Sequence, residues 1–143
     1  LPIYERATGL TRTYPGVLAA LEVLAAAGHP MGICTNKPEG PARAVLRDLG
    51  LARFFGAVVG GDTLGVVKPD PAPLRACLAA LGGGPAVFVG DSEVDAATAV
   101  AAEMPFLLFT EGYRKGPPES LPQAGRFQDF AALPGMVAGL ARA

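Results

Sequence analysis

The sequence Pro85-Ala86-Val87-Phe88-Val89-Gly90-Asp91-Ser92-Glu93-Val94-Asp95 decides the fold, because an apolar run ends here at a carboxylate and a helical pattern follows at once. The unbroken run from Ala86 to Val89 predicts a strand that is buried on both faces, as in a parallel sheet. One face of the following helix is predicted from the spacing of Val94, Ala97, Thr98 and Ala101. Asp91 would lie at the carboxyl end of the strand, where open α/β sheets bind their ligands. Asp95 lies one helical turn further on, so its side chain is predicted to point back to the same place.

The composition favours one globular domain and excludes several classes of partner. The 143 residues are 50% hydrophobic, which is enough for one buried core. Twelve basic and 13 acidic residues give a net charge of -1, and no basic run indicates a nucleic-acid surface. The longest apolar stretch, Val17 to Ala27, is interrupted by Glu22 and falls short of the roughly 20 residues that span a bilayer. Leu1 to Arg6 does not resemble a signal peptide, so we expect a cytoplasmic protein with no membrane partner.

Cysteine and histidine usage argues against several common kinds of site. Cys34 and Cys77 lie in apolar patterns without paired spacing, which favours two core residues over a disulfide or a zinc site. His29 stands between Gly28 and Pro30, where a helix should end, and this favours a capping or loop position. A Ser-His-Asp or Cys-His mechanism is therefore not expected.

Predicted strands and helices alternate along the chain. The expected strands are residues 31–34, 57–59, 86–89, 106–109 and 126–128, and the expected helices are 17–27, one that begins at Pro41, one after Asp70 as its N-cap, one after Asp91, and one within 131–143. Leu18, Leu21 and Leu24 should form the apolar side of the first helix. This order predicts an α/β fold, a Rossmann-like three-layer sandwich with a parallel sheet. No strand is followed by Gly-x-Gly-x-x-Gly, so neither a nicotinamide nor a flavin cofactor is expected.

Three predicted loops carry side chains that suit a phosphate group and a divalent metal. Thr35-Asn36 follows a buried strand, Lys68 precedes a helix, and Asp91 with Asp95 supplies two carboxylates. Hydroxyl and helix-start N–H groups bind phosphate oxygens, a lysine neutralises them, and carboxylates hold magnesium. Taken singly, each residue has a simpler interpretation: a strand-end hydroxyl, a solvated lysine and an N-cap.

The order of these motifs resembles the haloacid dehalogenase superfamily. Thr-Asn after a buried strand, then Lys-Pro before a helix, then Gly-Asp-Ser-x-x-Asp is similar to the second, third and fourth motifs of that superfamily. Within it, the chain looks most like the phosphoglycolate phosphatases. The segments that carry this closer resemblance are Tyr14-Pro15-Gly16-Val17, Thr35-Asn36-Lys37, Gly60-Gly61-Asp62, Lys68-Pro69-Asp70-Pro71 and Gly90 to Asp95.

The resemblance implies a magnesium-dependent phosphatase that acts on small phosphomonoesters such as 2-phosphoglycolate. Thr35 and Lys68 would be catalytic and would bind the phosphoryl group together with Asn36, which would contribute mainly through backbone and loop geometry. Asp91 would coordinate Mg²⁺. Asp95 and Ser92 would not bind the ion directly: Asp95 would hold the metal site through hydrogen bonds or a metal-bound water, and Ser92 would contribute through the geometry of the loop. A dehalogenase or a sugar-phosphate mutase of the family is less expected, because the Gly-Asp pattern at Asp91 is typical of neither.

The family's first motif, Asp-x-Asp-Gly-Thr, does not occur in this sequence. In the family its first aspartate attacks phosphorus and its second protonates the leaving group. The helical cap that the family inserts after this motif is also missing, so residues 1–14 are interpreted as the exit of the cap and 15–143 as an incomplete core domain. Without its first strand, the sheet should have two unpaired edges, at residues 31–35 and 86–90. We expect the nucleophile to lie on upstream sequence.

Two other functions remain open at this stage. A catalytically inactive phosphate-binding or assembly module would keep the phosphate site without the nucleophile, and it would bind phosphate without turnover. A two-component receiver domain shares the topology but needs paired acids and a phospho-accepting aspartate that the sequence does not show. The substrate is expected to be a small phosphorylated metabolite whose identity the cap would select, and an exposed sheet edge makes a homo-oligomer possible.

Overall fold

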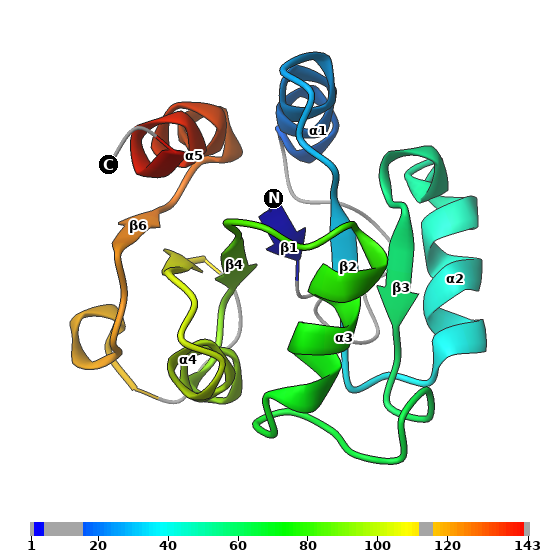
Figure 1. The fold of residues 1–143 in the computed structure, drawn as a ribbon. Helices are drawn as coiled ribbons and strands as arrows, with labels where there is room; N and C mark the ends of the chain where they lie inside the picture. Colours follow the sequence, from blue (N-terminus) through cyan, green and yellow to red (C-terminus); the bar gives the residue numbers. More distant parts are fainter. Residues whose placement is uncertain (1, 5–15, 112–115, 142–143) are drawn as a thin grey trace.

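The structure, a computed structural model, describes residues 2–4, 16–111 and 116–141. Its sheet has six strands in the order β3-β2-β1-β4-β5-β6, and every neighbouring pair is parallel (Figure 1). The strands are β1 (Pro2–Tyr4), β2 (Gly32–Cys34), β3 (Ala57–Val59), β4 (Val87–Gly90), β5 (Phe106–Phe109) and β6 (Gly125–Phe127). This arrangement confirms the predicted Rossmann-like α/β class.

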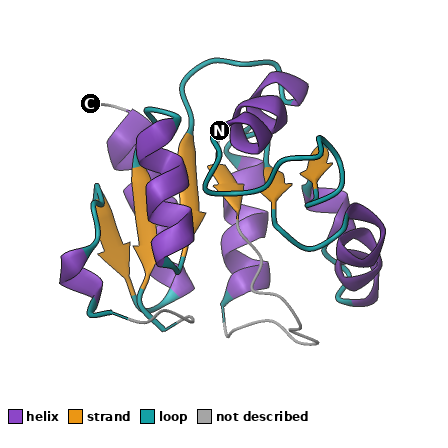
Figure 2. Cartoon of the chain, turned by 90° about the horizontal axis from the view of Figure 1, so that it is seen from below, coloured by secondary structure: helices purple, strands orange, loops and turns teal. Residues whose placement is uncertain are grey.

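Helices cover both faces of the sheet (Figure 2). They are α1 (Val17–Ala26), α2 (Glu39–Asp48), α3 (Ala72–Ala80), α4 (Glu93–Ala101) and α5 (Leu133–Ala141), with short 3-10 turns at Ala52–Phe54, Pro118–Ser120 and Phe130–Ala132. Buried residues of α1, α2 and α5 pack in one core cluster, and those of α3 and α4 pack in the other. Val87 and Val89 belong to the first cluster and Phe88 to the second, as expected for a strand that is buried on both faces. The three layers are therefore those that the sequence predicted.

The centre of the sheet differs from the prediction. The sequence pattern indicates a connecting segment at residues 2–4 and predicts unpaired edges on β2 and β4. The structure instead places Pro2–Tyr4 between these two strands, with Ile3 opposite Gly32 on one side and Phe88 on the other. An extended segment here satisfies the backbone groups of both neighbours, which would otherwise be buried without partners. The rest of the segment 1–14, from residue 5 onward, lies outside the described residues.

Helix α4 buries a different face from the one predicted. Val94 is 40% exposed and Ala97 is also exposed, whereas the buried residues are Asp95, Ala96, Thr98 and Ala99. The hydroxyl of Thr98 donates to the carbonyl of Val94, so this buried polar group is satisfied within the helix. The helix is turned so that a carboxylate, and not a valine, faces the sheet. A polar contact described below accounts for this rotation.

Smaller departures concern the ends and faces of other helices. Leu18 is 45% exposed although it was expected on the apolar side of α1, and α1 packs through Val17, Ala20, Leu21 and Leu24 instead. Helix α2 begins at Glu39, two residues before the predicted start. The N-cap of α3 is Pro71, one residue after the predicted Asp70, whose carboxylate nevertheless accepts a hydrogen bond from the backbone N–H of Ala72 at 2.8 Å. No helix in the described part of the chain has the length and apolar character needed to cross a membrane.

Candidate active site

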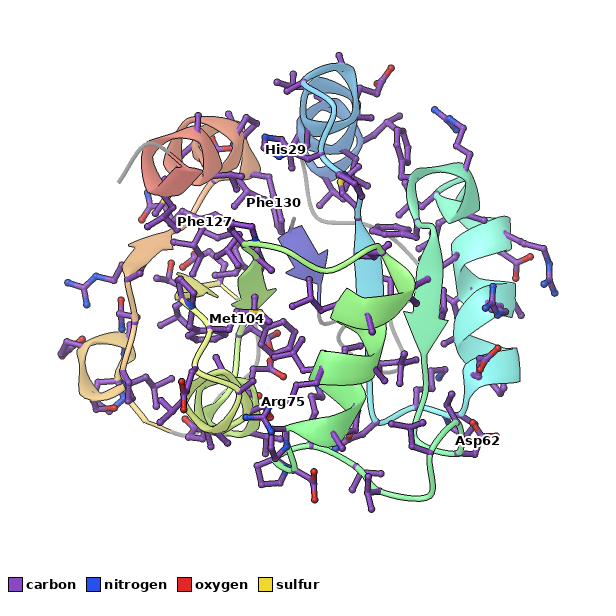
Figure 3. All side chains as sticks on the ribbon, in the orientation of Figure 1. His29, Asp62, Arg75, Met104, Phe127 and Phe130 are labelled. Carbon is purple, nitrogen blue, oxygen red and sulfur yellow. The ribbon has the colours of Figure 1, made fainter. Side chains whose placement is uncertain are left out.

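The residues singled out from the sequence lie at one edge of the sheet. Thr35 follows the carboxyl end of β2, Asp91 follows that of β4, and Lys68 lies in the loop between β3 and α3. Since all strands are parallel, their carboxyl ends meet at the same edge. Figure 3 shows Asp62, which follows β3, at this edge, whereas His29 lies at the opposite end of the sheet.

A buried ion pair joins the third and fourth motifs. The Nζ atom of Lys68 donates to Oδ1 of Asp95 at 2.7 Å, and the two side chains are only 3% and 1% exposed. The ammonium group also lies 5.6 Å from the centre of the Phe88 ring, on β4. Burial lowers the pKa of Lys68, while the charge and hydrogen bond of Asp95, and the charge of Asp91, act in the opposite direction. The lysine is therefore held in a dry, negatively charged position.

Asp95 connects this lysine to the end of β4. Its second oxygen, Oδ2, accepts a hydrogen bond from the backbone N–H of Asp91 at 3.0 Å. Its own backbone N–H donates to Oγ of Ser92 at 3.2 Å, so Ser92 is the N-cap of α4. The side chain lies directly over Gly90, where an added Cβ would be 2.6 Å from Oδ2. Gly90 is thus required because a side chain there would displace the carboxylate that holds Lys68.

Thr35 is buried at the start of the loop after β2. It is 2% exposed, and its backbone N–H extends the sheet by donating to the carbonyl of Val59 at 2.9 Å. Its hydroxyl oxygen accepts a hydrogen bond from the backbone N–H of Lys37 at 3.2 Å, which tightens the turn. The structure therefore brings a hydroxyl to the same edge as the Lys68–Asp95 pair.

Asn36 contacts Lys68 instead of pointing into open space. Its Oδ1 accepts from the backbone N–H of Lys68 at 2.9 Å, and its Nδ2 donates to the carbonyl of Lys68 at 3.2 Å. A carboxamide thus pairs with both backbone groups of one residue, 32 positions along the chain. The sequence placed Asn36 beside the phosphate and gave no signal for this contact, because the spacing between the two residues is set by the tertiary fold.

The sequence also missed a polar cluster at the start of α2. Asp62 accepts a hydrogen bond from the backbone N–H of Glu39 at 2.9 Å through Oδ1, and so caps a helix that follows a different strand. Thr63 donates to Oε1 of Glu39 at 2.9 Å and accepts from the N–H of Gly60 at 2.8 Å. Hydrogen bonds from Arg43 and Thr63 lower the pKa of Glu39. The sequence signal for this cluster was the pair of glycines before Asp62, Gly60 and Gly61, which leave room for another backbone segment to approach closely.

Those glycines allow two loops to touch. A Cβ on Gly60 would collide with the backbone of Glu39 and Lys37, and one on Gly61 would collide with the carbonyl of Asn36. The backbone N–H of Gly61 donates to the carbonyl of Lys37 at 2.8 Å. The loop that carries Lys68 is therefore packed directly on the loop that carries Thr35 and Asn36.

The donor set at this edge is compatible with Mg²⁺. Asp91 is partly buried at the end of β4, while both oxygens of Asp95 already accept hydrogen bonds from Lys68 and Asp91. Among the described residues, no group of three or more His, Cys, Asp or Glu side chains is arranged as a metal site. Mg²⁺ commonly binds through one or two carboxylates and completes its shell with water and substrate phosphate, so a single protein carboxylate is a plausible donor. Direct coordination of Mg²⁺ by Asp91 stays a prediction.

Comparison with known protein sequences agrees with this geometry. The family model described as haloacid dehalogenase-like hydrolase matches residues 3–103. A phosphoglycolate phosphatase of Cereibacter sphaeroides (strain ATCC 17029) is 52% identical over 128 residues, which are 90% of this chain and 59% of that protein. One from Rhodospirillum rubrum is 56% identical over 122 residues, which are 84% of this chain and 51% of that protein. The chain thus spans between half and three-fifths of the length of these relatives.

Solved structures show the same core. A predicted phosphoglycolate phosphatase from Haemophilus somnus 129pt superposes with a TM-score of 0.82 at 32% sequence identity, over 87% of this chain and 56% of that one. The parallel sheet, the buried lysine-aspartate pair at its carboxyl edge and the match over residues 3–103 all lead to one conclusion: this chain belongs to the haloacid dehalogenase-like hydrolase family.

Proposed function

We propose that the intact protein is a magnesium-dependent phosphatase of small phosphomonoesters, with 2-phosphoglycolate as the leading substrate. The observation that carries this proposal is the Lys68–Asp95 pair, which fixes a cation at the carboxyl edge of the sheet, the edge at which Thr35 and Asp91 follow β2 and β4. The names of the relatives support the substrate, since proteins described as phosphoglycolate phosphatases align with most of this chain at more than 50% identity.

In the proposed reaction Thr35 and Lys68 bind the phosphoryl group. The hydroxyl of Thr35 would donate to a phosphoryl oxygen, and Lys68 would neutralise charge that builds up on the phosphoryl group and on the attacking carboxylate. Asp95 orients the lysine, because its Oδ1 is 2.7 Å from Nζ. A bare lysine on a flexible loop would lose more conformational freedom on binding phosphate than one that is already held in place.

Asp91 would hold Mg²⁺, with Asp95 and Ser92 supporting it through the turn that they form. The metal would supply positive charge that offsets the charge of the phosphate and of the attacking carboxylate. Oδ2 of Asp95 accepts a hydrogen bond from the backbone N–H of Asp91 at 3.0 Å, and the backbone N–H of Asp95 donates to Oγ of Ser92 at 3.2 Å, so the two bonds close the turn that carries Asp91. The proposed metal role of Asp91 thus depends on a rigid turn at the start of α4.

The nucleophile would come from the part of the relatives' length that this chain does not span. Its carboxylate would attack phosphorus, the bond to the alcohol oxygen would break, and the alcohol would leave with a proton from a neighbouring acid. Water would then hydrolyse the aspartyl-phosphate, which releases inorganic phosphate and restores the carboxylate. In this proposal the catalytic core comprises strand β1 (Pro2–Tyr4) together with residues 15–143, and not residues 15–143 alone as the sequence predicted.

Replacing Asp91 with Ala tests the proposal in the intact protein. We expect magnesium-dependent hydrolysis of 2-phosphoglycolate to fall by a factor of at least about 100, because the metal would lose its carboxylate. Asp48→Ala is the matched control, since Asp48 is exposed and ends α2 (Glu39–Asp48), whose other end, at Glu39, is the one that contacts Asp62. Unchanged turnover in Asp91→Ala would contradict the metal assignment. Phosphate binding without turnover in the unmodified intact protein would favour an inactive phosphate-binding module instead.

A further inference from the structure

The loop that carries Lys68 is exposed everywhere except at the lysine itself. From residue 62 to residue 70, Lys68 is the single buried residue, at 5% exposure, and Leu64, Val66 and Val67 are 40% exposed or more. Such a segment has few apolar contacts that would hold its backbone in place. Polar contacts on either side of the exposed stretch therefore contribute to the position of Lys68.

The first of these contacts lies at the base of the loop. Gly61 donates to the carbonyl of Lys37, Asp62 caps α2 at Glu39, and Thr63 bonds the Glu39 carboxylate at 2.9 Å. These bonds attach residues 60–63 to the loop after β2. They end five residues before Lys68, with Gly65 at a positive φ of 78° in the exposed stretch between. The bonds at the base therefore do not reach Lys68 itself, which lies within a turn where the backbone N–H of Asp70 donates to the carbonyl of Val67 at 3.0 Å.

The second contact is the carboxamide of Asn36. The donor and acceptor geometry fixes its orientation, because the N–H of Lys68 can only donate to Oδ1 and the carbonyl of Lys68 can only accept from Nδ2. Two bonds to the same residue restrain both the position and the direction of its backbone. One carboxamide thus gives Lys68 the pairing that a neighbouring strand would give to a residue of a sheet.

We propose that Asn36 is a positioning residue: its carboxamide holds the backbone of Lys68 so that the ammonium group reaches Asp95 and the phosphate. Its effect on catalysis rests on the proposed phosphatase function, whereas its effect on the Lys68 backbone does not. The sequence expects Asn36 to contribute to phosphate binding mainly through backbone and loop geometry, and the proposal names the contact by which its side chain does so. The side chain acts through Lys68, and so the effect of changing it on phosphate binding and on kinetics should disappear when the Lys68 ammonium group is removed, whereas its contact with the residue-68 backbone does not need that group.

Amide hydrogen exchange tests the contact without an activity assay. In Asn36→Ala the backbone N–H of Lys68 loses its acceptor, and we expect it to exchange at least about tenfold faster than in the unmodified intact protein. Asn36→Asp retains an acceptor oxygen and should keep more of the protection than Asn36→Ala. Gln123→Ala is the matched control, because Gln123 also holds a loop through its carboxamide, by donating to Pro118 and Leu121. Equal exchange at Lys68 in Asn36→Ala and the unmodified protein would overturn the proposal.

Kinetics and phosphate binding then separate positioning from direct contact. We expect Asn36→Ala to lower kcat/KM for 2-phosphoglycolate by about 10- to 100-fold, since small displacements of a catalytic group have effects of that size. The affinity for inorganic phosphate, measured by calorimetry, should fall in Asn36→Ala but show no further fall when Asn36→Ala is added to Lys68→Met. A further loss in that background would show that Asn36 contacts phosphate itself and would refute the positioning role.

The proposed phosphatase function and the positioning role of Asn36 can be refuted separately. An unmodified intact protein that hydrolyses no phosphomonoester would refute the proposed function, and with it the catalytic role of Asn36. Faster exchange at Lys68 in Asn36→Ala would still establish the contact in that case. An active protein in which Asn36→Ala changes neither kcat/KM nor exchange would refute the positioning role alone.

Discussion

At the scale of single residues, the site depends on burying opposite charges together. A lysine and an aspartate that are each no more than 3% exposed would be costly to bury separately, because the interior solvates charge poorly. Their 2.7 Å contact, with Asp95 also accepting from the N–H of Asp91, offsets this cost. Replacing both residues with apolar ones should therefore affect stability much less than replacing one.

A double-mutant cycle measures that coupling. We expect Asp95→Ala alone to lower the free energy of unfolding by about 3–5 kcal/mol, because it leaves the Lys68 ammonium buried without its partner. Lys68→Met combined with Asp95→Ala should lower it by much less than the sum of the two single changes. Urea unfolding of the unmodified protein, Lys68→Met, Asp95→Ala and the double variant gives the coupling free energy between the two side chains. Strictly additive losses would show that the two side chains do not depend on each other.

The buried cysteines predict a loss of stability at high pH. Burial raises the pKa of Cys77 to about 12, and burial together with the neighbouring charges of Cys77 and Asp95 raises the pKa of Cys34. An unfolded cysteine has a pKa near 9, so above that pH the unfolded chain releases protons that the folded chain retains. The stabilising effect of the folded thiols is therefore complete below pH 9 and declines as the pH rises toward 12.

We expect this decline to be smaller in Cys77→Ala. Denaturant unfolding at pH 8, 9, 10 and 11 should show a steeper fall of the unfolding free energy for the unmodified protein than for the variant. The variant will be less stable at every pH, since Cys77 is fully buried against β2, so the slope is the quantity to compare. Parallel slopes would mean that the Cys77 thiol titrates normally in the folded protein.

At the scale of elements, the two loops after β2 and β3 behave as one unit. Helix α2 has no side-chain cap from its own N-cap residue, Pro38, and the cap comes from Asp62 in the other loop. Gly60 and Gly61 permit this contact because any Cβ at either position would strike the backbone of the first loop. The glycines, the cap and the Asn36–Lys68 bonds all act between the same two segments.

Asp62→Ala should therefore weaken α2, although Asp62 lies 23 residues away from the N–H that it caps. We expect a loss of about 1 kcal/mol in the free energy of unfolding, which is the usual effect of removing an N-cap. Asp62→Asn keeps an acceptor oxygen and should retain most of that stability. Thermal unfolding of the two variants provides the comparison, and equal midpoints would contradict the capping role.

At the scale of the whole molecule, the sheet depends on its shortest central element. Strand β1 has only three residues, yet it pairs with β2 on one side and with β4 on the other and so joins the two halves of the sheet. Pro2, its first residue, has no N–H to contribute, and proline is tolerated at the start of a strand. A proline at position 3, in the middle of the strand, would not be tolerated.

We expect Ile3→Pro to lower the free energy of unfolding by about 3 kcal/mol or more, because it removes a backbone donor from the middle of a sheet. Urea unfolding followed by circular dichroism measures the loss. A variant as stable as the unmodified protein would mean that residues 2–4 do not form the central strand. The order β3-β2-β1-β4-β5-β6 would then need revision at its centre.

The sequence by itself determined the alternation of strands and helices, the class of fold and the set of motif residues. Strands 57–59 and 106–109 were predicted with the bounds that the structure shows, because continuous apolar runs between turns are a local signal. Thr35, Lys68, Asp91 and Asp95 were identified from residue type and order, and the structure brings them to one edge of the sheet.

Only the tertiary structure decided which side chains meet. Apolar spacing predicted Val94 on the buried face of α4, but the Lys68 ion pair requires Asp95 to face inward, and a contact across 27 residues leaves no local pattern. The bonds of Asn36 and Asp62 were missed for the same reason. Strand β1 was missed because its pairing comes from the unsatisfied backbone groups of β2 and β4, and not from any periodicity of its own three residues.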